Sequence, residues 1–254
     1  MSAQPFLEIK NLTVAYPDGV KAIKNLSAVI NRNSVTSIIG SDNGGKTTLL
    51  RALNRMHELY PNIRREGDIL LEGRSIFGMN PMEVRRKIGL VFYQAMPFMN
   101  MSIAKNVISG YSLNRIKLSK EEKERLIEEN LEKVGLWGEI KDLLDKKPYI
   151  LRRGQQQRLC IARTIALEPE IILLDNPTAS ISTYCVNIIE NMIMELKEKH
   201  TLVLVPNSIV QAGRLSDYIM YIETGELIEY NTANNILVNP QNELTEKYIT
   251  AETE

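Results

Sequence analysis

The chain has 254 residues, of which 44% are hydrophobic and 24% are charged, a composition typical of an ordinary globular protein. Its 31 Lys and Arg residues balance its 31 Asp and Glu residues, so the formal net charge is zero. This balance argues against a nucleic-acid partner and against a polybasic membrane anchor. No apolar run approaches the roughly 18 residues of a membrane span, so we expect any work at a membrane to need docking onto another subunit.

Short apolar runs alternate with longer amphipathic stretches, which predicts an α/β fold with a mostly parallel sheet. The expected strands are Phe6–Leu12, Ala22–Ile30, Ser34–Ile39, Asp68–Leu71, Ile88–Phe92, Ile171–Leu174, Thr201–Val205 and Tyr218–Ile222. Helical patterns cover Lys46–His57, Ser102–Val134 and Gln155–Leu167. We expect one domain over residues 1–254, with an α/β core at 1–94 and 164–254 and an inserted helical subdomain at 95–163.

A glycine-rich segment between an expected strand and an expected helix matches the pattern G-x-x-x-x-G-K-[ST]. In that context its backbone N–H groups predict a phosphate cradle at the start of a helix. Lys46 is expected to reach the β- and γ-phosphates, and the Thr47 hydroxyl to hold magnesium. The predicted nucleotide-binding residues here are Gly40, Ser41, Asp42, Asn43, Gly44, Gly45, Lys46, Thr47 and Thr48.

Asp42 is an unfavourable residue for this loop because its carboxylate lies where the negative charge of a triphosphate is expected. Two like charges about 4 Å apart repel by several kcal/mol at an effective dielectric of ~20. Asn43 is compatible with the loop because Asn adopts left-handed backbone conformations more readily than most residues. We therefore expect the loop to form but to bind a triphosphate weakly.

Two further segments match the pattern of a nucleotide-binding site. Ile171–Asp175 is an apolar strand that ends in an acid, which is expected to hold magnesium opposite Thr47. The second segment, Gly154–Arg163, lies between the glycine-rich loop and this strand. It consists of a glycine, a run of glutamines and a helix face with the residues Ile-Ala-Arg. With these motifs the sequence resembles an ABC-type ATPase over nearly its whole length. The resemblance implies a P-loop core, an N-terminal antiparallel β subdomain and an inserted helical subdomain.

Segments outside the nucleotide motifs are similar to the ATPases of phosphate importers. They are Leu53–Met56, Ser102–Val107, Gln155–Arg163, Gly225–Glu229 and Asn239–Thr250. That likeness implies ATP and Mg²⁺ as cofactors, a homodimer, membrane permease subunits as partners and a peripheral place on the cytoplasmic face of the membrane. It also suggests that Tyr16 stacks on adenine, whereas an ordinary hairpin tyrosine is the alternative of about equal weight.

The chain departs from the family where catalysis takes place. The signature Leu-Ser-Gly-Gly-Gln is replaced by Leu151, Arg152, Arg153, Gly154 and Gln155, and the arginine side chains obstruct the close approach that serine and glycine allow.

At the position of the family's catalytic glutamate this chain has Asn176, whose amide cannot accept a proton from water. Loss of a general base typically costs ~10²–10⁴ in rate. Asn207 replaces the family's switch histidine, and Ser182 replaces the aspartate of the family's D-loop. In the Q-loop the residues leave open whether Tyr93 or Gln94 takes the magnesium-linked position.

These changes give three interpretations. The chain is a working ATPase that energises phosphate import, or a pseudo-ATPase, natural or engineered, that binds nucleotide with little hydrolysis, or a scaffold that binds none. We favour the second because Lys46, Thr47 and Asp175 are retained. The head-to-tail dimer that the resemblance implies would also set Asp42 against Arg152 or Arg153 of a second copy.

Overall fold

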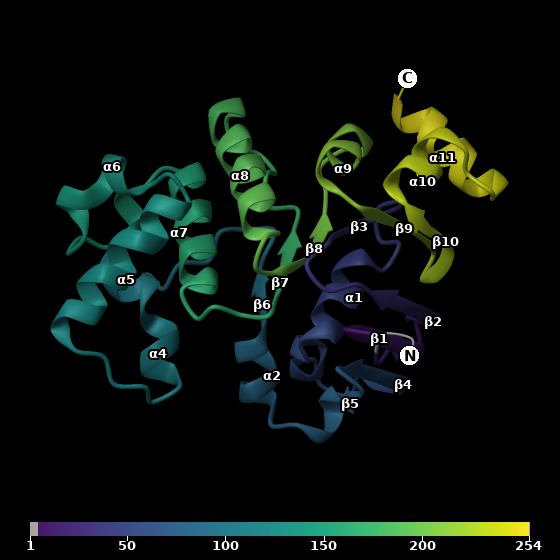
Figure 1. The fold of residues 1–254 in the computed structure, drawn as a ribbon. Helices are drawn as coiled ribbons and strands as arrows, with labels where there is room; N and C mark the ends of the chain where they lie inside the picture. The colour runs from purple at the N-terminus through teal and green to yellow at the C-terminus, as the bar shows by residue number, and fades with distance from the viewer. Residues whose placement is uncertain (1–4, 254) are drawn as a thin grey trace.

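The computed structural model describes residues 5–253 and contains two sheets (Figure 1). A four-stranded antiparallel sheet has the order β2-β1-β4-β5, and a six-stranded sheet has the order β10-β9-β3-β8-β7-β6. In the larger sheet only the β10–β9 pair of the described strands is antiparallel. The expected α/β fold with an antiparallel N-terminal subdomain is thus confirmed.

Every expected strand is present. Thr201–Val205 has the expected bounds, and the bounds of the others differ by one to a few residues. The strands are β1 Leu7–Ala15, β2 Lys21–Ile30, β3 Val35–Ile39, β4 Arg64–Leu71, β5 Arg74–Ser75, β6 Ile88–Val91, β7 Ile171–Asp175, β8 Thr201–Val205, β9 Tyr218–Glu223 and β10 Glu226–Thr232. The helices are α1 Lys46–Leu53, α2 Pro81–Lys87, α3 Ile103–Val107, α4 Ser109–Leu113, α5 Lys120–Lys133, α6 Trp137–Ile140, α7 Arg153–Ile165, α8 Thr183–Leu196, α9 Ile209–Leu215, α10 Ala233–Val238 and α11 Glu243–Thr253. Short 3₁₀ turns add Met56–Leu59, Ile76–Gly78, Lys141–Leu143 and Pro148–Ile150.

The larger sheet is buried between two layers, as the pleat of β7 shows. Ile171 and Leu173 pack in the core formed with α1 and the smaller sheet, whereas Ile172 and Leu174 pack in the core formed with α7 and α8. Because successive side chains of a strand point to opposite faces, a strand covered on both faces is apolar throughout. Figure 1 shows α1 below the sheet and α8 and α9 above it.

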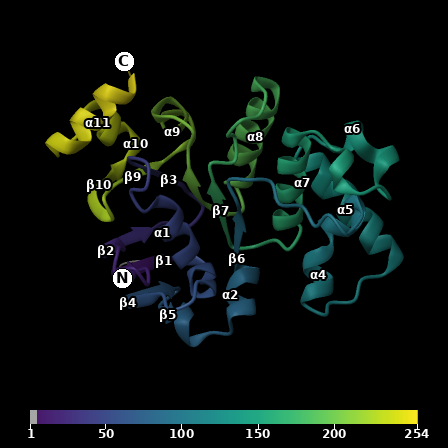
Figure 2. The same cartoon turned by 180° about the vertical axis from the view of Figure 1, so that it is seen from behind.

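Between β6 and β7 the chain forms α3 to α7, which lie to one side of the sheet in both ribbon views (Figures 1 and 2). Their apolar faces share a core with α8 and with one face of β7. The proposed subdomain boundary at 95–163 stays a prediction, and residues 1–4 and 254 of the expected domain lie outside the described residues.

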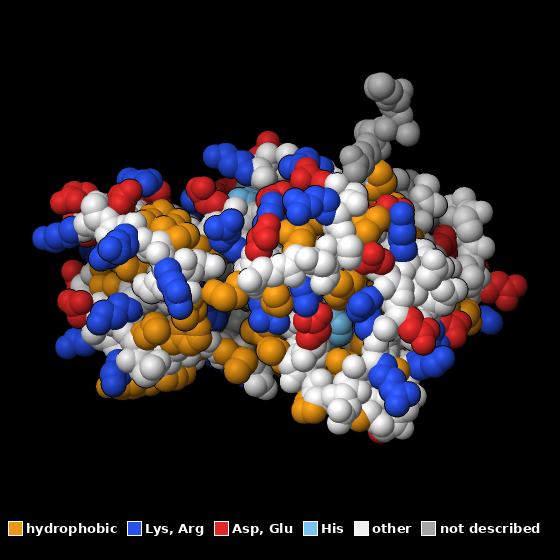
Figure 3. Space-filling model, turned by 90° about the horizontal axis from the view of Figure 1, so that it is seen from below, with side chains coloured by type: hydrophobic (Ala, Val, Ile, Leu, Met, Phe, Trp, Pro, Cys, Tyr) orange, Lys and Arg blue, Asp and Glu red, His pale blue; other side chains and the backbone are white. Residues whose placement is uncertain are grey.

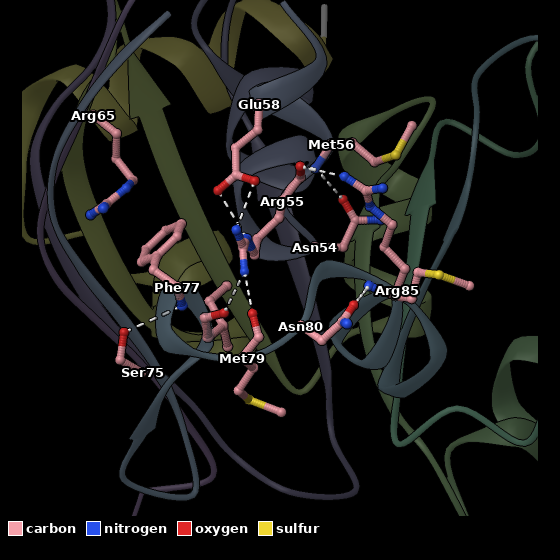
Figure 4. Close-up of polar contacts among 12 residues, drawn as sticks. Asn54, Arg55, Met56, Glu58, Arg65, Ser75, Phe77, Met79, Asn80 and Arg85 are labelled. Carbon is pink, nitrogen blue, oxygen red and sulfur yellow. Dashed lines mark hydrogen bonds and ion pairs between the residues drawn. The ribbon is translucent and has the colours of Figure 1, made fainter. Parts of the chain in front are cut away.

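The helix that the periodicity predicted over Lys46–His57 ends at Leu53, because Arg55 has a left-handed backbone (φ 62°). Its guanidinium donates to the carbonyls of Ile76 (3.1 Å) and Met79 (2.7 Å) and pairs with Glu58 at 2.9 Å, as Figure 4 shows. These contacts tie the end of α1 to the segment after β5. The local sequence predicts a longer helix, and a tertiary contact shortens it.

Candidate nucleotide-binding site

The phosphate loop follows β3 and opens α1, and two of its glycines have no room for a side chain. Gly40 has φ 143°, and a Cβ there would lie 1.9 Å from the carbonyl oxygen of Ile222. Gly45 has φ 106°, and its Cβ would lie 2.3 Å from the carbonyl oxygen of Ala22. Asn43 adopts the left-handed conformation expected of it, with φ 61°. The backbone therefore makes the tight turn that a phosphate cradle requires.

Lys46 curls back onto its own loop. Its Nζ donates to the carbonyl oxygens of Gly40 and Ser41, each at 2.6 Å. Burial lowers the pKa of Lys46, and the nearby charges of Asp42, Glu223 and others oppose that shift. Asp42 has the largest effect among these charges, and it acts on the ammonium group that a nucleotide phosphate would need.

Thr47 contacts the acid at the end of β7. Its hydroxyl donates to Oδ1 of Asp175 at 3.2 Å. Asp175 is 5% exposed, and burial raises its pKa, with the Thr47 bond and the charges of Arg51 and Lys46 acting in the opposite direction. A hydroxyl and a carboxylate oxygen are hard ligands of the kind that Mg²⁺ selects.

Tyr16 is fixed beside the loop by two contacts. Its hydroxyl lies 3.1 Å from Oγ1 of Thr48, and its ring meets the ring of Tyr60 edge-on at 5.6 Å between centroids. Tyr60 is in turn hydrogen-bonded to the guanidinium of Arg51. The sequence did not single out Tyr60 or Arg51, because their role depends on a contact between a hairpin and a helix.

These groups share one cleft of 910 Å³. Its described lining includes the predicted residues Tyr16, Asp42, Asn43, Gly44, Gly45, Lys46, Thr47, Thr48, Asp175 and Asn176, and also Lys21, Lys24, Arg51, Tyr93 and Gly225. The predicted residues Gly40 and Ser41 are not among the described lining residues, but their carbonyls accept from Lys46, which is.

Tyr93, and not Gln94, is among the described lining residues of the cleft. A phenol therefore faces the cleft in this segment, and which of the two residues takes the position of the family's glutamine stays open. The metal role that we predicted for Gln94 stays a prediction. Tyr93 is 45% exposed, so its ring lies at the open side of the cleft.

Asn176 occupies the position next to Asp175 with a left-handed backbone, φ 44°. Its N–H donates to the carbonyl of Val205 at 3.0 Å, while its side-chain oxygen is buried without a hydrogen-bond partner. Buried polar atoms are nearly always paired, so an orphaned oxygen in a cleft indicates a place for a polar ligand or water. An amide there can orient such a molecule but cannot take its proton.

Asn207 is exposed just after β8 and is absent from the described lining of the cleft. Its N–H donates to Oε1 of Gln211 at 2.8 Å, and Gln211 also pairs with Thr178 and Glu190. Gln211 thereby ties the segment after β8 to the segment after β7. Sequence reasoning missed Gln211, because a buried glutamine on a short helix has no pattern of its own.

The signature residues lie on α7, and the described lining of the cleft in the same chain does not include them. Arg152 and Arg153 are exposed at the start of that helix. Gly154 packs closely, since a Cβ would lie 2.7 Å from Sγ of Cys185. Gln155 donates to Glu139 at 2.9 Å.

The chain matches the family model described as ABC transporter over residues 23–179. The chain belongs to the ABC transporter family. Among curated relatives it is 43% identical over 249 residues to the phosphate import ATP-binding protein PstB of Thermotoga maritima, covering 97% of this chain and 98% of the relative. It is 42% identical to the protein of the same name from Tropheryma whipplei strain Twist, covering 96% of each chain. The resemblance to phosphate importer ATPases is confirmed.

Solved structures agree with this fold. A dimeric ATP-binding cassette in a post-hydrolysis state, bound to ADP and phosphate, superposes with a TM-score of 0.79 at 27% identity, covering 89% of this chain and 98% of that one. The cbiO1 protein of Clostridium perfringens, part of an ABC transporter complex, gives 0.77 at 25% identity, covering 93% and 92%. No helix among the described residues is long and apolar enough to cross a membrane.

Proposed function

We propose that this ABC-family chain is the nucleotide-binding subunit of a phosphate importer that binds ATP weakly and hydrolyses it little or not at all. The observation that carries the proposal is the composition of one cleft. Lys46, Thr47 and Asp175 supply the groups for binding phosphate and magnesium, whereas Asn176 replaces the expected proton acceptor. The same cleft is thus equipped for binding and poorly equipped for cleavage.

ATP and Mg²⁺ fit the residues present. The loop backbone and Lys46 would hold the phosphates, Thr47 and Asp175 would hold the metal, and Tyr16 would stack on the base. Magnesium would neutralise part of the phosphate charge. The orphaned oxygen of Asn176 marks where an additional polar group or water would be held.

Affinity is reduced by Asp42, whose carboxylate acts on the Lys46 ammonium and would repel a γ-phosphate bound there. Turnover is reduced by several changes at once. An amide at Asn176 cannot serve as a general base, and the arginines at 152 and 153 replace small residues at the signature. Because catalytic groups act as a unit, their losses do not add, but several together leave little rate.

A membrane partner would fit the groove between the core and the helices α3 to α7. This groove of 210 Å³ is lined by residues that include Arg85, Phe92, Phe98, Leu113 and Arg163. Figure 3, which views the molecule of Figure 1 from below, shows hydrophobic side chains gathered on the helical part of that face. We propose that permease subunits dock here, which would place the chain at the cytoplasmic face of a membrane.

A second copy of the chain is the other partner that we propose. The exposed residues Arg152 and Arg153 at the start of α7 and the exposed Asp42 at the cleft carry opposite charges. Asp42 forms no ion pair within 4 Å among the described residues. In a head-to-tail homodimer they would face each other across the interface. Such exposed pairs contribute only ~0–1 kcal/mol each, so they would assist a dimer rather than create one.

The test combines two measurements on the purified chain. Calorimetry with ATP and Mg²⁺ measures binding, and a phosphate-release assay measures turnover. Binding with no release above background supports the proposal. Release at the rate of a working transporter would establish the active ATPase instead, and the absence of binding at millimolar nucleotide would establish the scaffold.

A further inference from the structure

The C-terminal helix α11 reaches the first residue of the phosphate loop, 208 positions earlier in the chain. The hydroxyl of Tyr248 donates to the carbonyl oxygen of Gly40 and accepts from its N–H, both at 3.3 Å. The ring of Tyr248 stacks on Tyr221 of β9 at 4.9 Å between centroids and 25° between planes. The loop is therefore in contact with an element that the nucleotide motifs do not include.

A second contact from β9 holds the next residue of the loop. Ser41 donates to Glu223 through its hydroxyl (2.6 Å) and through its N–H (3.3 Å). Glu223 also accepts from the hydroxyl of Tyr221 at 3.3 Å. Tyr248, Tyr221 and Glu223 thus form one connected network, which we call the loop clamp, around Gly40 and Ser41.

The decisive atom is the carbonyl oxygen of Gly40. It accepts from Nζ of Lys46 at 2.6 Å as well as from Tyr248. When Lys46 turns to bind phosphate, this oxygen loses its stronger donor. Gly40 is buried, and a buried carbonyl without a partner costs free energy comparable to a lost hydrogen bond. Tyr248 keeps the carbonyl paired and so lowers the cost of releasing Lys46.

We propose that Tyr248 is a positioning residue of the nucleotide site, holding the phosphate loop open for binding by retaining Gly40 after Lys46 leaves it. This inference rests on the proposed nucleotide binding. It gives α11 an effect on affinity through a residue that is absent from the described lining of the cleft. The carboxylate of Glu252, also on α11, is among the charges that act on Lys46.

The test compares Tyr248→Phe with Tyr230→Phe in the full chain. The first variant keeps the ring that stacks on Tyr221 and removes only the hydroxyl. The control removes a hydroxyl that donates to the carbonyl of Val29 at 2.7 Å, in a different part of the fold. Each variant loses one tyrosine hydroxyl bond to a backbone carbonyl, so the general effect of that loss appears in both. Tyr248→Phe also loses the bond from the Gly40 N–H.

Two readouts are needed. Calorimetry should show nucleotide binding weakened about three- to tenfold in Tyr248→Phe and unchanged in the control, because only Tyr248→Phe leaves the Gly40 carbonyl without a partner after Lys46 turns away. Hydrogen exchange without nucleotide should be about three- to tenfold faster over residues 40–45 in Tyr248→Phe alone.

Equal binding and equal exchange in the two variants would overturn the role of Tyr248. If the wild-type chain bound no nucleotide, the proposed function would fail. The exchange experiment would still decide whether Tyr248 holds the loop, because it needs no ligand.

Discussion

Thr47 and Asp175 lie 128 positions apart in the sequence, and the Thr47 hydroxyl donates to the Asp175 carboxylate at 3.2 Å. This bond joins the start of α1 to the end of β7 across the floor of the cleft. Burial raises the pKa of Asp175, so the folded chain without metal binds a proton there more readily than the unfolded chain does. Ionisation of a buried carboxylate costs free energy when the group is alone and becomes favourable beside a cation.

The free-energy cost of ionising the buried Asp175 predicts a pH-dependent effect of Asp175→Asn on stability, measured in the presence of a chelator. The folded-state pKa is raised, so the stability linked to the protonated form is complete below the ordinary aspartate pKa and is lost as pH rises through the folded-state value. Asp175→Asn should therefore melt at a higher temperature than wild type at pH 7, with a difference that shrinks as pH falls toward about 4. The exposed Asp142→Asn serves as control, and a pH-independent difference would contradict the prediction.

Asp42→Ser should strengthen ATP binding by about tenfold or more and ADP binding by less. The carboxylate of Asp42 acts on the Lys46 ammonium and would repel a γ-phosphate bound there. ADP lacks the γ-phosphate, so the removal of this repulsion benefits ATP more. Calorimetry with both nucleotides measures the difference, again with Asp142→Asn as control. Equal gains for ATP and ADP would show that Asp42 does not act at the γ-phosphate.

Tyr16 offers a test of base stacking. Tyr16→Ala should weaken nucleotide binding by about tenfold, because stacking on an aromatic ring is worth ~1–3 kcal/mol per base. Tyr16→Phe keeps the ring and the edge-on contact with Tyr60 but loses the bond to Thr48, so its loss should be threefold or less. If the two variants bound equally, Tyr16 would be an ordinary hairpin tyrosine.

Restoring catalytic groups should recover hydrolysis in steps. Asn176→Glu supplies a proton acceptor beside Asp175 and should raise phosphate release by up to ~10² over wild type. Adding Asn207→His should raise it further, and full rates should require the signature substitutions Arg152→Ser and Arg153→Gly as well. A wild-type rate already equal to that of the quadruple variant would refute the pseudo-ATPase proposal.

The helix that carries the signature depends on a buried ion pair. Arg158 is 1% exposed, and its Nη2 donates to both carboxylate oxygens of Glu139 at 2.8 and 2.9 Å. Glu139→Gln should lower the free energy of unfolding by about 1–3 kcal/mol, because it leaves a buried guanidinium without its counter-charge.

Urea denaturation measures this cost against Glu129→Gln. That control breaks the exposed pair of Arg125 and Glu129 and should cost less than about 0.5 kcal/mol. Equal costs in the two variants would mean that burial of Arg158 adds nothing.

The sequence by itself determined the fold class, the phosphate loop and the family. Apolar runs such as Ile171–Leu174 have one stable place, inside a sheet covered on both faces, and the glycines at 40 and 45 permit one kind of turn. These features are local, so residue type and spacing were sufficient to find them.

Only the tertiary structure decided which side chains meet. It placed Tyr93 rather than Gln94 on the cleft, ended α1 at Leu53 through the contacts of Arg55, and brought Tyr248 of α11 onto Gly40. Each of these outcomes depends on a contact between residues far apart in the chain or on the path of a loop. No periodicity records such a contact, because its free energy comes from packing between elements and not from the segment itself.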